Sequence, residues 1–325
     1  MRLFVQAFAL AVCLYGEASG PALAQIYPAK PLRMIVPFPP GGAADIIGRI
    51  LAQRLSEQLR QPVIVDNRAG ASGNVGAEAV AKAQADGYTL LMGALTSHAI
   101  NYTLERKVLR YDLERDLSPV TIVATVPYVL VVHPSVPVLS MQELIAYARA
   151  RPGHLSYGSS GTGAPQRLAA EMLRLRTGIE MVHIPYKGSS QVITDLVGGQ
   201  VLTAFESVPT ALPHIRAAKL RALAVTTARR IPMLPEVPTM EEAALPSFEV
   251  SSTFGILAPA GTPRPLIERL NAETAKVVQL ADVKERFLQQ GAFATSTTPE
   301  QAASRIRSEI AMWARVISEA NIKPD

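Results

Sequence analysis

Short apolar segments alternate with segments of helical periodicity along most of the chain. The apolar segments have the length and β-branched content of strands, whereas a segment such as 46–59 repeats apolar residues on one helix face. The predicted strands are residues 32–37, 62–66, 88–93, 120–132, 155–158, 181–185, 201–206, 220–226 and 250–258. This alternation predicts an α/β fold with a parallel sheet.

Two lobes are expected, because a chain of about 300 residues exceeds one compact core of ordinary size. Beyond about residue 255 the pattern is chiefly helical, and Trp313 lies on the apolar side of the last helix. We expect this terminal segment to dock on the first lobe. Lobe 1 is therefore predicted at 27–124 plus 252–325, and lobe 2 at 125–251. Capping boxes mark three predicted helix starts, at Ser140 with Glu143, Thr239 with Glu242, and Thr298 with Gln301.

Residues 1–24 have the pattern of a signal peptide. Arg2 precedes an apolar run, 3–15, that is too short to span a bilayer, and Ala22-Leu23-Ala24 is a small-x-small cleavage signal. We predict cleavage before Gln25 and export to the periplasm. A lipoprotein signal at Cys13 is the alternative, but Val12 stands where that signal needs a small residue.

Composition excludes several classes of function. Cys13 is the single cysteine, so the mature chain is predicted to contain no disulfide, cysteine metal site or cysteine nucleophile. The net charge is +5, but basic residues are scattered among acidic ones and the longest basic run is Arg229-Arg230, which argues against nucleic-acid binding. The five histidines show neither H-x-x-x-H nor H-E-x-x-H spacing, so no metal or cofactor is expected.

Two glycine-rich junctions between a strand and a helix are the candidate binding loops. The first runs from Val36 to Asp45, and the second from Tyr157 to Gln166. A helix that begins at the carboxyl end of a strand directs unpaired N–H groups towards the ligand crevice of an α/β sheet, which suits an anion. The alternative for the first loop is that its glycines only make the turn while Asp45 satisfies amides of the first helical turn.

Two further junctions give weaker signals. Residues 66–76 contain three glycines but lack the G-x-G-x-x-G and Gly-Lys-Ser/Thr patterns of nucleotide-binding loops. In 184–190, Tyr186 offers a rigid wall and Lys187 a charge partner, although a loop lysine is more often solvated. Asp195 follows on the next predicted helix, facing either the cleft or solvent.

The order of these motifs resembles the Bug family, the substrate-binding receptors of tripartite tricarboxylate transporters. The resemblance covers the whole mature chain, through VPFPPGGAADIIGRILAQRL, YGSSGTGAPQRLAAEML, HIPYKGSSQVITDLVGGQV and FGILAPAGTPRPLIERLN among others. It implies a two-lobe type II periplasmic-binding-protein (Venus flytrap) fold that closes on a small carboxylate. The implied partners are the membrane subunits of such a transporter, and the implied state is a monomer. The ligand is expected between residues 38–45 and 159–166, held by backbone amides, hydroxyls and waters.

We therefore expect a non-enzymatic receptor for an amino acid, a di- or tricarboxylate, or an aromatic carboxylate. A sensory partner of a membrane kinase and a serine hydrolase using Ser159 or Ser160 are the alternatives. Leu202 and Ser252-Thr253 depart from the family pattern and are expected to affect the width or polarity of the cleft. The predicted ligand-binding residues are Phe38, Pro39, Gly41, Gly42, Ala43, Asp45, Ser159, Gly161, Thr162, Gln166, Tyr186, Lys187 and Asp195.

Overall fold

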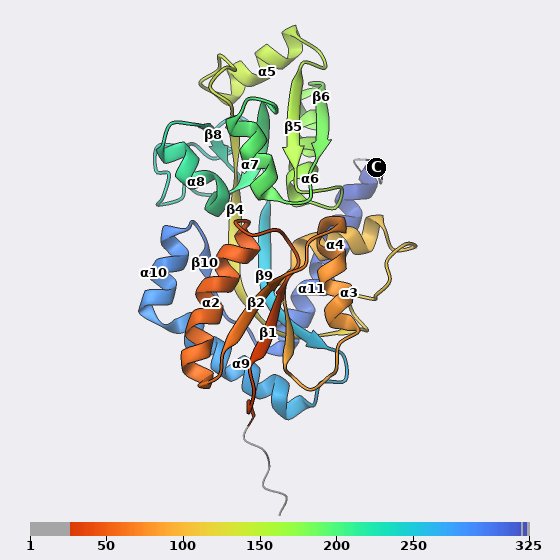
Figure 1. The fold of residues 1–325 in the computed structure, drawn as a ribbon. Helices are drawn as coiled ribbons and strands as arrows, with labels where there is room; N and C mark the ends of the chain where they lie inside the picture. Colours follow the sequence, from red (N-terminus) through yellow and green to blue (C-terminus); the bar gives the residue numbers. More distant parts are fainter. Residues whose placement is uncertain (1–26, 320, 324–325) are drawn as a thin grey trace, which may run out of the picture.

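Two long strands connect two α/β lobes, one above the other, in the computed structural model (Figure 1). The structure describes residues 27–319 and 321–323, so the predicted signal peptide and Cys13 lie outside the described residues. The connecting strands are β4 (Leu117–Val132) and β9 (Ser251–Pro259), which pair antiparallel from Leu117 with Pro259 to Pro127 with Ser251. The two lobes thus share one continuous sheet, in the order β2-β1-β3-β9-β4-β7-β5-β6.

The first lobe has a parallel core of β1 and its two neighbours, β2 and β3. Helices cover both faces of this part of the sheet, since α2 packs with α9 and α10 on one side and α3 with β1 and β3 on the other. Its elements are β1 (Leu32–Val36), α2 (Ala43–Leu59), β2 (Val63–Asn67), the 3₁₀ turn η1 (Ala71–Gly73), α3 (Asn74–Ala81), β3 (Thr89–Ala94), α4 (Leu95–Leu104), α9 (Arg264–Gln279), α10 (Ala281–Gln289) and β10 (Phe293–Ala294).

The second lobe is built on the far half of β4, where β7 and β8 pair antiparallel with it, and on the parallel strands β5 to β7. Its elements are α5 (Met141–Ala150), β5 (Leu155–Ser159), α6 (Pro165–Thr177), β6 (Met181–Pro185), α7 (Ser189–Val197), β7 (Thr203–Ser207), α8 (Val208–Arg216) and β8 (Arg221–Val225). The nine predicted strands all appear in the structure, and β10 was not predicted.

The partners of β4 change at Pro127 and Tyr128. Pro127 is the last residue of β4 that pairs with β9, and Tyr128 is the first that pairs with β7. Proline has no N–H to donate to a ladder, so it suits the point where one set of pairs ends. The Tyr128 N–H donates instead to Thr226 Oγ1 (3.0 Å), and its hydroxyl lies 2.6 Å from Ser252 Oγ on β9.

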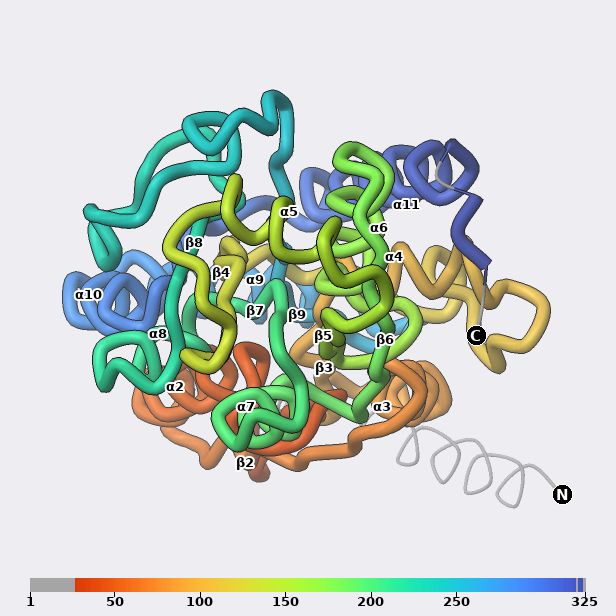
Figure 2. Tube along the Cα trace, turned by 90° about the horizontal axis from the view of Figure 1, so that it is seen from above, coloured from red at the N-terminus to blue at the C-terminus, as the bar shows by residue number. Residues whose placement is uncertain are grey.

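The last helix, α11 (Pro299–Glu319), contributes to the cores of both lobes. Ile306 belongs to an apolar cluster with residues of β1 and β3, whereas Trp313 and Ile317 belong to a cluster with residues of β5 and α6. The helix lies along α4 (Figure 2), and just beyond it the Lys323 carbonyl accepts from Arg167 Nη2 of α6 (3.0 Å). The predicted lobe limits stay a prediction, because this helix belongs to neither lobe alone.

Two of the three capping boxes begin helices, and the third does not. Ser140 accepts from the Glu143 N–H at the start of α5, and Thr298 and Gln301 bond reciprocally at the start of α11. Thr239 and Glu242 also bond reciprocally, but the expected helix there is wrong, because only a turn forms.

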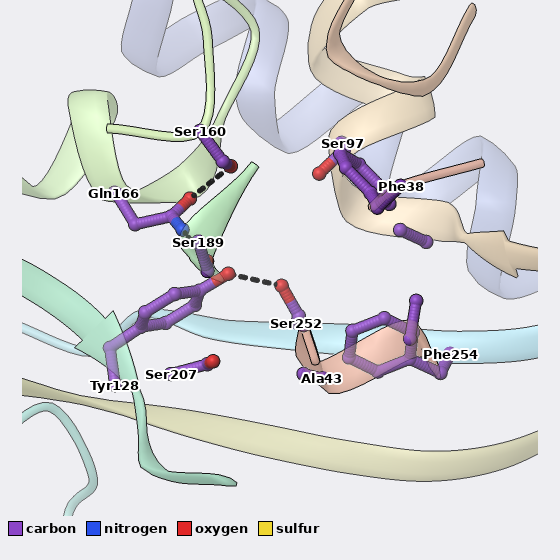
Figure 3. Close-up of a pocket in the computed structure, with 13 residues that line it drawn as sticks. Phe38, Ala43, Ser97, Tyr128, Ser160, Gln166, Ser189, Ser207, Ser252 and Phe254 are labelled. Atoms are coloured by element: carbon purple, nitrogen blue, oxygen red, sulfur yellow. Dashed lines mark hydrogen bonds between the residues drawn. The ribbon is translucent and has the colours of Figure 1, made fainter. Parts of the chain in front are cut away.

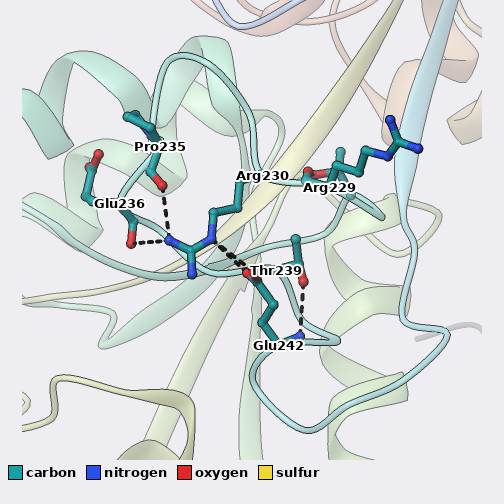
Figure 4. A network of polar contacts seen from close by, with 7 residues as sticks. Arg229, Arg230, Pro235, Glu236, Thr239 and Glu242 are labelled. Carbon is teal, nitrogen blue, oxygen red and sulfur yellow. Dashed lines mark hydrogen bonds and ion pairs between the residues drawn. The ribbon is translucent and has the colours of Figure 1, made fainter.

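Glu242 instead organises the loop after β8 (Figure 4). Its carboxylate accepts from Arg230 Nε (2.9 Å), and Arg230 Nη1 donates to the carbonyl of Pro235 (3.1 Å). The chain then leaves the helical region at Ala244, which has φ of 67°. The box therefore closes a loop rather than opening a helix.

Replacing Trp313 with Ala should lower the free energy of unfolding by about 3–5 kcal/mol, because a large buried ring would leave a cavity between α11 and the second lobe. Urea denaturation followed by circular dichroism measures this change. Met312→Ala, at a neighbouring side chain that is 45% exposed, is the control and should cost less than about 1 kcal/mol. Equal losses for the two variants would contradict the bridging role of α11.

Candidate functional site

A cavity lies between the lobes, beside the two connecting strands (Figure 3). Tyr128 of β4 and Ser252 of β9 form its floor, and the strand-to-helix junctions of both lobes form its walls. The lining residues are Phe38, Gly42, Ala43, Ala44, Ala94, Ser97, Tyr128, Ser160, Gln166, Ser189, Ser207, Ser252 and Phe254.

The lining is polar but contains no Lys, Arg, His, Asp or Glu among the residues described. Five serine hydroxyls, one tyrosine hydroxyl and one glutamine amide supply its hydrogen-bonding groups, and Phe38 and Phe254 supply an apolar side. A ligand here would have to be recognised by hydrogen bonds and shape, since the lining contains no charged side chain that could form an ion pair with it.

Five helices begin at this cavity. The residue before or within the first turn of α2, α4, α6, α7 and α8 belongs to the lining, namely Gly42, Ala94, Gln166, Ser189 and Ser207. The first turn of a helix has unpaired N–H groups and a partial positive charge, and an anion placed there is stabilised by about 0.3–2 kcal/mol per helix. The arrangement provides positive potential without any cationic side chain.

The first predicted loop contributes the predicted residues Phe38, Gly42 and Ala43 to the lining, together with Ala44, whereas Pro39, Gly41 and Asp45 lie elsewhere. Gly41 has φ of 84° and lines a neighbouring cavity with His214, and Pro39 packs against Gly188 of the other lobe. These two stay predictions as ligand contacts.

Asp45 lies beneath that loop rather than on the cavity. Its carboxylate accepts from the Gly41 N–H (3.0 Å), Asn67 Nδ2 (2.9 Å) and Arg49 (2.9 Å). Burial alone would raise the pKa of Asp45, but these hydrogen bonds and the Arg49 charge hold it below its ordinary value. Asp45 therefore stays ionised and braces the turn, as in the alternative that the sequence left open.

The second predicted loop contributes Ser160 and Gln166, which bond to each other through Ser160 Oγ and Gln166 Oε1 (3.1 Å). Ser159 is fully buried and bonds to His183 Nε2 (2.7 Å) instead. Gly161 has φ of 125° and faces Ser72 of the first lobe, and the Thr162 carbonyl accepts from Arg167 Nη1 (3.3 Å). Ser159, Gly161 and Thr162 lie outside the lining, and their predicted ligand contacts stay a prediction.

The third group of predicted residues also lies outside the lining. The Tyr186 hydroxyl donates to Asp195 Oδ2 (2.7 Å), so each satisfies the other, and Lys187 is exposed. The same segment contributes Ser189 in their place. The structure thus brings Phe38, Gly42, Ala43 and Gln166 together, and leaves Tyr186, Lys187 and Asp195 at the edge of the second lobe.

Several lining residues were missed from the sequence: Ala44, Ala94, Ser97, Tyr128, Ser160, Ser189, Ser207, Ser252 and Phe254. A signal existed for Ser207, which directly follows the predicted strand 201–206 and precedes Pro209 in the first turn of a helix. Ser252 was noted as a departure from the family pattern, and it lies on the cavity floor. Leu202, the other departure, is at the opposite end of β7, where it packs in the core of the second lobe.

A buried carboxyl, that of Glu206, stands behind the cavity wall. Its Oε2 accepts from the Ser207 N–H (3.1 Å) and Thr210 Oγ1 (2.9 Å), whereas Oε1 has no hydrogen-bond partner in the part of the chain described. Burial raises the pKa of Glu206 to about 7, and the hydrogen bonds from Thr210 and the Ser207 N–H offset only part of that rise. The group therefore titrates near neutral pH.

The lobes touch around the cavity at glycines of the second lobe. A Cβ at Gly188 would lie 2.5 Å from Pro39 Cδ, and a Cβ at Gly163 would overlap the Asn101 side chain of α4. Gly161 meets Ser72 in the same way. These positions lack side chains, so the backbone of the second lobe lies directly against side chains of the first lobe beside the cavity.

The chain matches known proteins over nearly its full length. A profile described as "Tripartite tricarboxylate transporter family receptor" matches residues 47–322. Protein BugT of Bordetella pertussis (strain Tohama I) is 42% identical over 306 residues, which cover 94% of each chain. R. palustris Rpa4515 with adipate has a TM-score of 0.89 at 38% identity, covering 92% of this chain and 100% of that one. MatC from Rhodopseudomonas palustris with bound malate has a TM-score of 0.83 at 30% identity, with 90% and 100% covered.

Two α/β lobes on a shared sheet, with a polar cavity where the sheet crosses between them, define a periplasmic-binding-protein fold of the two-lobe type. The match in sequence and fold is specific within that class. The chain belongs to the tripartite tricarboxylate transporter receptor family, which includes the Bug proteins, and is a solute-binding receptor. The fold and family predicted from the sequence are confirmed.

Gly188→Ala should hold the lobes apart and weaken ligand binding. The backbone at Gly188 is extended (φ 176°), so alanine adds no backbone strain, and the added methyl group acts only against Pro39. Small-angle scattering should show a larger radius of gyration than in the wild type. Gly198→Ala, at the far end of α7, is the matched control and should leave the scattering curve unchanged. A closed Gly188→Ala protein would show that this contact does not limit closure.

Proposed function

We propose that this receptor captures a small carboxylate between its lobes in the periplasm and delivers it to the membrane subunits of a tripartite tricarboxylate transporter. The observation that carries the proposal is the convergence of five helix N-termini and seven hydroxyl or amide side chains on one cavity without a basic residue. Such donors stabilise an anion by charge-assisted hydrogen bonds. The adipate and malate bound by the two structural relatives support this ligand class.

The ligand would also hold the lobes together. Its contacts would come from Phe38 and Gly42 on the first lobe and from Ser160, Gln166 and Ser207 on the second. A ligand that touches both walls binds the closed state more tightly than the open state, and so shifts the population towards closure. The closed form, acting as a monomer, would then be the one presented to the transporter.

The hydrolase alternative has one observation in its favour, the contact of Ser159 Oγ with His183 Nε2 (2.7 Å). That serine has no exposed surface and lies outside the cavity lining, so it is not placed to attack a bound substrate. Ser160 does line the cavity, but its hydroxyl bonds to Gln166 rather than to a base. The geometry therefore supports a binding protein rather than an enzyme.

A carboxylate at about 100 times its Kd should raise the free energy of unfolding by roughly 2.7 kcal/mol, if it binds only the folded protein. A thermal-shift panel of adipate, malate, aromatic carboxylates, amino acids and neutral sugars tests this. Ser160→Ala should weaken the effect, because Ser160 lines the cavity. Ser308→Ala, at an exposed serine of α11 outside the lining, is its control. Shifts by sugars alone would contradict the carboxylate assignment.

We further propose that export removes residues 1–24. The apolar run of 3–15 and the Ala22-Leu23-Ala24 signal support it. Sequencing the amino terminus of protein recovered from the periplasmic fraction should give Gln25 or a residue within a few positions of it. An intact Met1, or a lipid-modified Cys13, would contradict this processing.

A further inference from the structure

The buried carboxyl of Glu206 is the ionisable group placed directly behind the wall of the cavity. Ser207, which lines the cavity, and Thr210 hold its Oε2, while the cavity residues Gln166 and Ser189 act in the direction that lowers its pKa. The lining itself offers no cation, as described above. An ionised Glu206 would therefore place a second negative charge beside a bound carboxylate, and two close carboxylates disfavour joint ionisation.

The charge on Glu206 also determines where two hydroxyl hydrogens point. Thr210 has one hydroxyl hydrogen, and an ionised Glu206 accepts it at 2.9 Å. The Ser207 hydroxyl lies 2.5 Å from Thr210 Oγ1 and must then be the donor in that contact. Ser207 would present only lone pairs to the cavity, and these repel a carboxylate oxygen.

Protonation of Glu206 reverses this chain of hydrogen bonds. A neutral Glu206 can donate from Oε2 to Thr210, whose own hydrogen can then go to the Ser207 carbonyl (2.8 Å) or to Ser207 Oγ. Donation to Ser207 Oγ frees the Ser207 hydrogen for the cavity, an arrangement that an ionised Glu206 does not allow. The Ser189 hydroxyl, which accepts from Gln166 Nε2 (2.9 Å), lines the same wall of the cavity.

We infer that the ligand-binding form of the receptor contains a neutral Glu206, so that capture of a carboxylate takes up a proton. Glu206 is then a specificity-determining residue, because it decides whether Ser207 offers a hydrogen or lone pairs to the ligand. The inference rests on the proposed function and deepens it. It predicts ligands that accept hydrogen bonds at this wall, and it disfavours ligands that place an ammonium group there.

The neighbouring elements leave Glu206 free to change its charge near neutral pH. Tyr128 on β4 stays neutral, because burial raises its pKa well above the ordinary value and Glu206 raises it further. On α7, Asp195 is bonded to Tyr186, and on α8, burial and Lys219 lower the pKa of His214, which keeps it neutral. Arg167 on α6 bonds to the carbonyls of Thr162 and Lys323. Burial gives Glu206 a pKa of about 7, so its charge changes between pH 6 and pH 8.

Calorimetry with adipate as the probe tests the inference. If only the neutral form binds, a pKa of about 7 makes Kd rise about tenfold between pH 6 and pH 8. Titrations at pH 8 in buffers of different ionisation enthalpy should show uptake of about 0.9 proton per adipate bound. Glu206→Gln, which is neutral at every pH, should bind with a Kd that does not change with pH and without proton uptake.

Glu171→Gln is the matched control, because Glu171 is a carboxyl of the same lobe that bonds to Tyr157 and Arg174, neither of which lines the cavity. This variant should keep the tenfold rise of Kd for adipate between pH 6 and pH 8. A pH-independent Kd in the wild type, or a tenfold change that persists in Glu206→Gln, overturns the role of Glu206 while leaving the carboxylate receptor intact. If Glu206→Gln does not fold, proton uptake by the wild type still tests the inference, because binding of adipate at pH 8 without proton uptake would overturn it. Failure of every carboxylate to bind the wild type at any pH overturns the proposed function itself.

Discussion

The pairing of β4 with β9 is the interaction on which the rest of the structure depends. These strands run side by side through the first lobe as far as Pro127, and β4 then continues into the second lobe, where it pairs with β7 from Tyr128 onward. The close approach depends on Gly255, because a Cβ there would lie 2.7 Å from the Thr121 carbonyl oxygen and 3.1 Å from Leu95. Since the exchange happens at the level of the cavity, one hydrogen-bonded strand pair fixes both the hinge and the floor of the site.

The helix N-termini follow from this topology. In a parallel α/β sheet the carboxyl ends of the strands share one edge, and the helices that follow begin at that edge. Here the two lobes turn those edges towards each other, so helices from both sides begin around the same space. The resulting potential is diffuse and comes from the backbone. Side chains on the wall can therefore differ between receptors of this class without removing the attraction for an anion.

Much of this could be predicted from the sequence, because it depends on local pattern. The strands, the capping boxes at Ser140 and Thr298, and the cavity positions of Phe38 and Gln166 all follow from periodicity and from strand-to-helix junctions. Neighbouring serines show where such reasoning ends. Ser159 and Ser160 look equivalent in sequence, yet one is buried against His183 and the other lines the cavity.

Long-range register explains the other omissions. Tyr128 and Ser252 meet only because β4 and β9 cross beside each other, and no local signal carries that register. Glu206 lies in a segment whose pattern is that of an ordinary buried strand. The role of its carboxyl depends on the hydrogen bond from Thr210 and on the helix starts packed around it, which the sequence does not reveal. At Thr239, the reciprocal hydrogen bonds of the capping box form as the sequence predicts. Glu242 also bonds to Arg230, however, and a turn forms there instead of a helix.

The C-terminal helix has a consequence for how affinity can evolve. Because α11 is packed into both lobes, opening the receptor must shift this helix against at least one of them. Its contacts therefore belong to the energy difference between open and closed forms. The apparent affinity of such a receptor is the intrinsic affinity reduced by the fraction of molecules already competent to bind. Substitutions along α11 can thus tune the sensitivity of the receptor to scarce solute, while the chemistry that recognises the solute stays untouched.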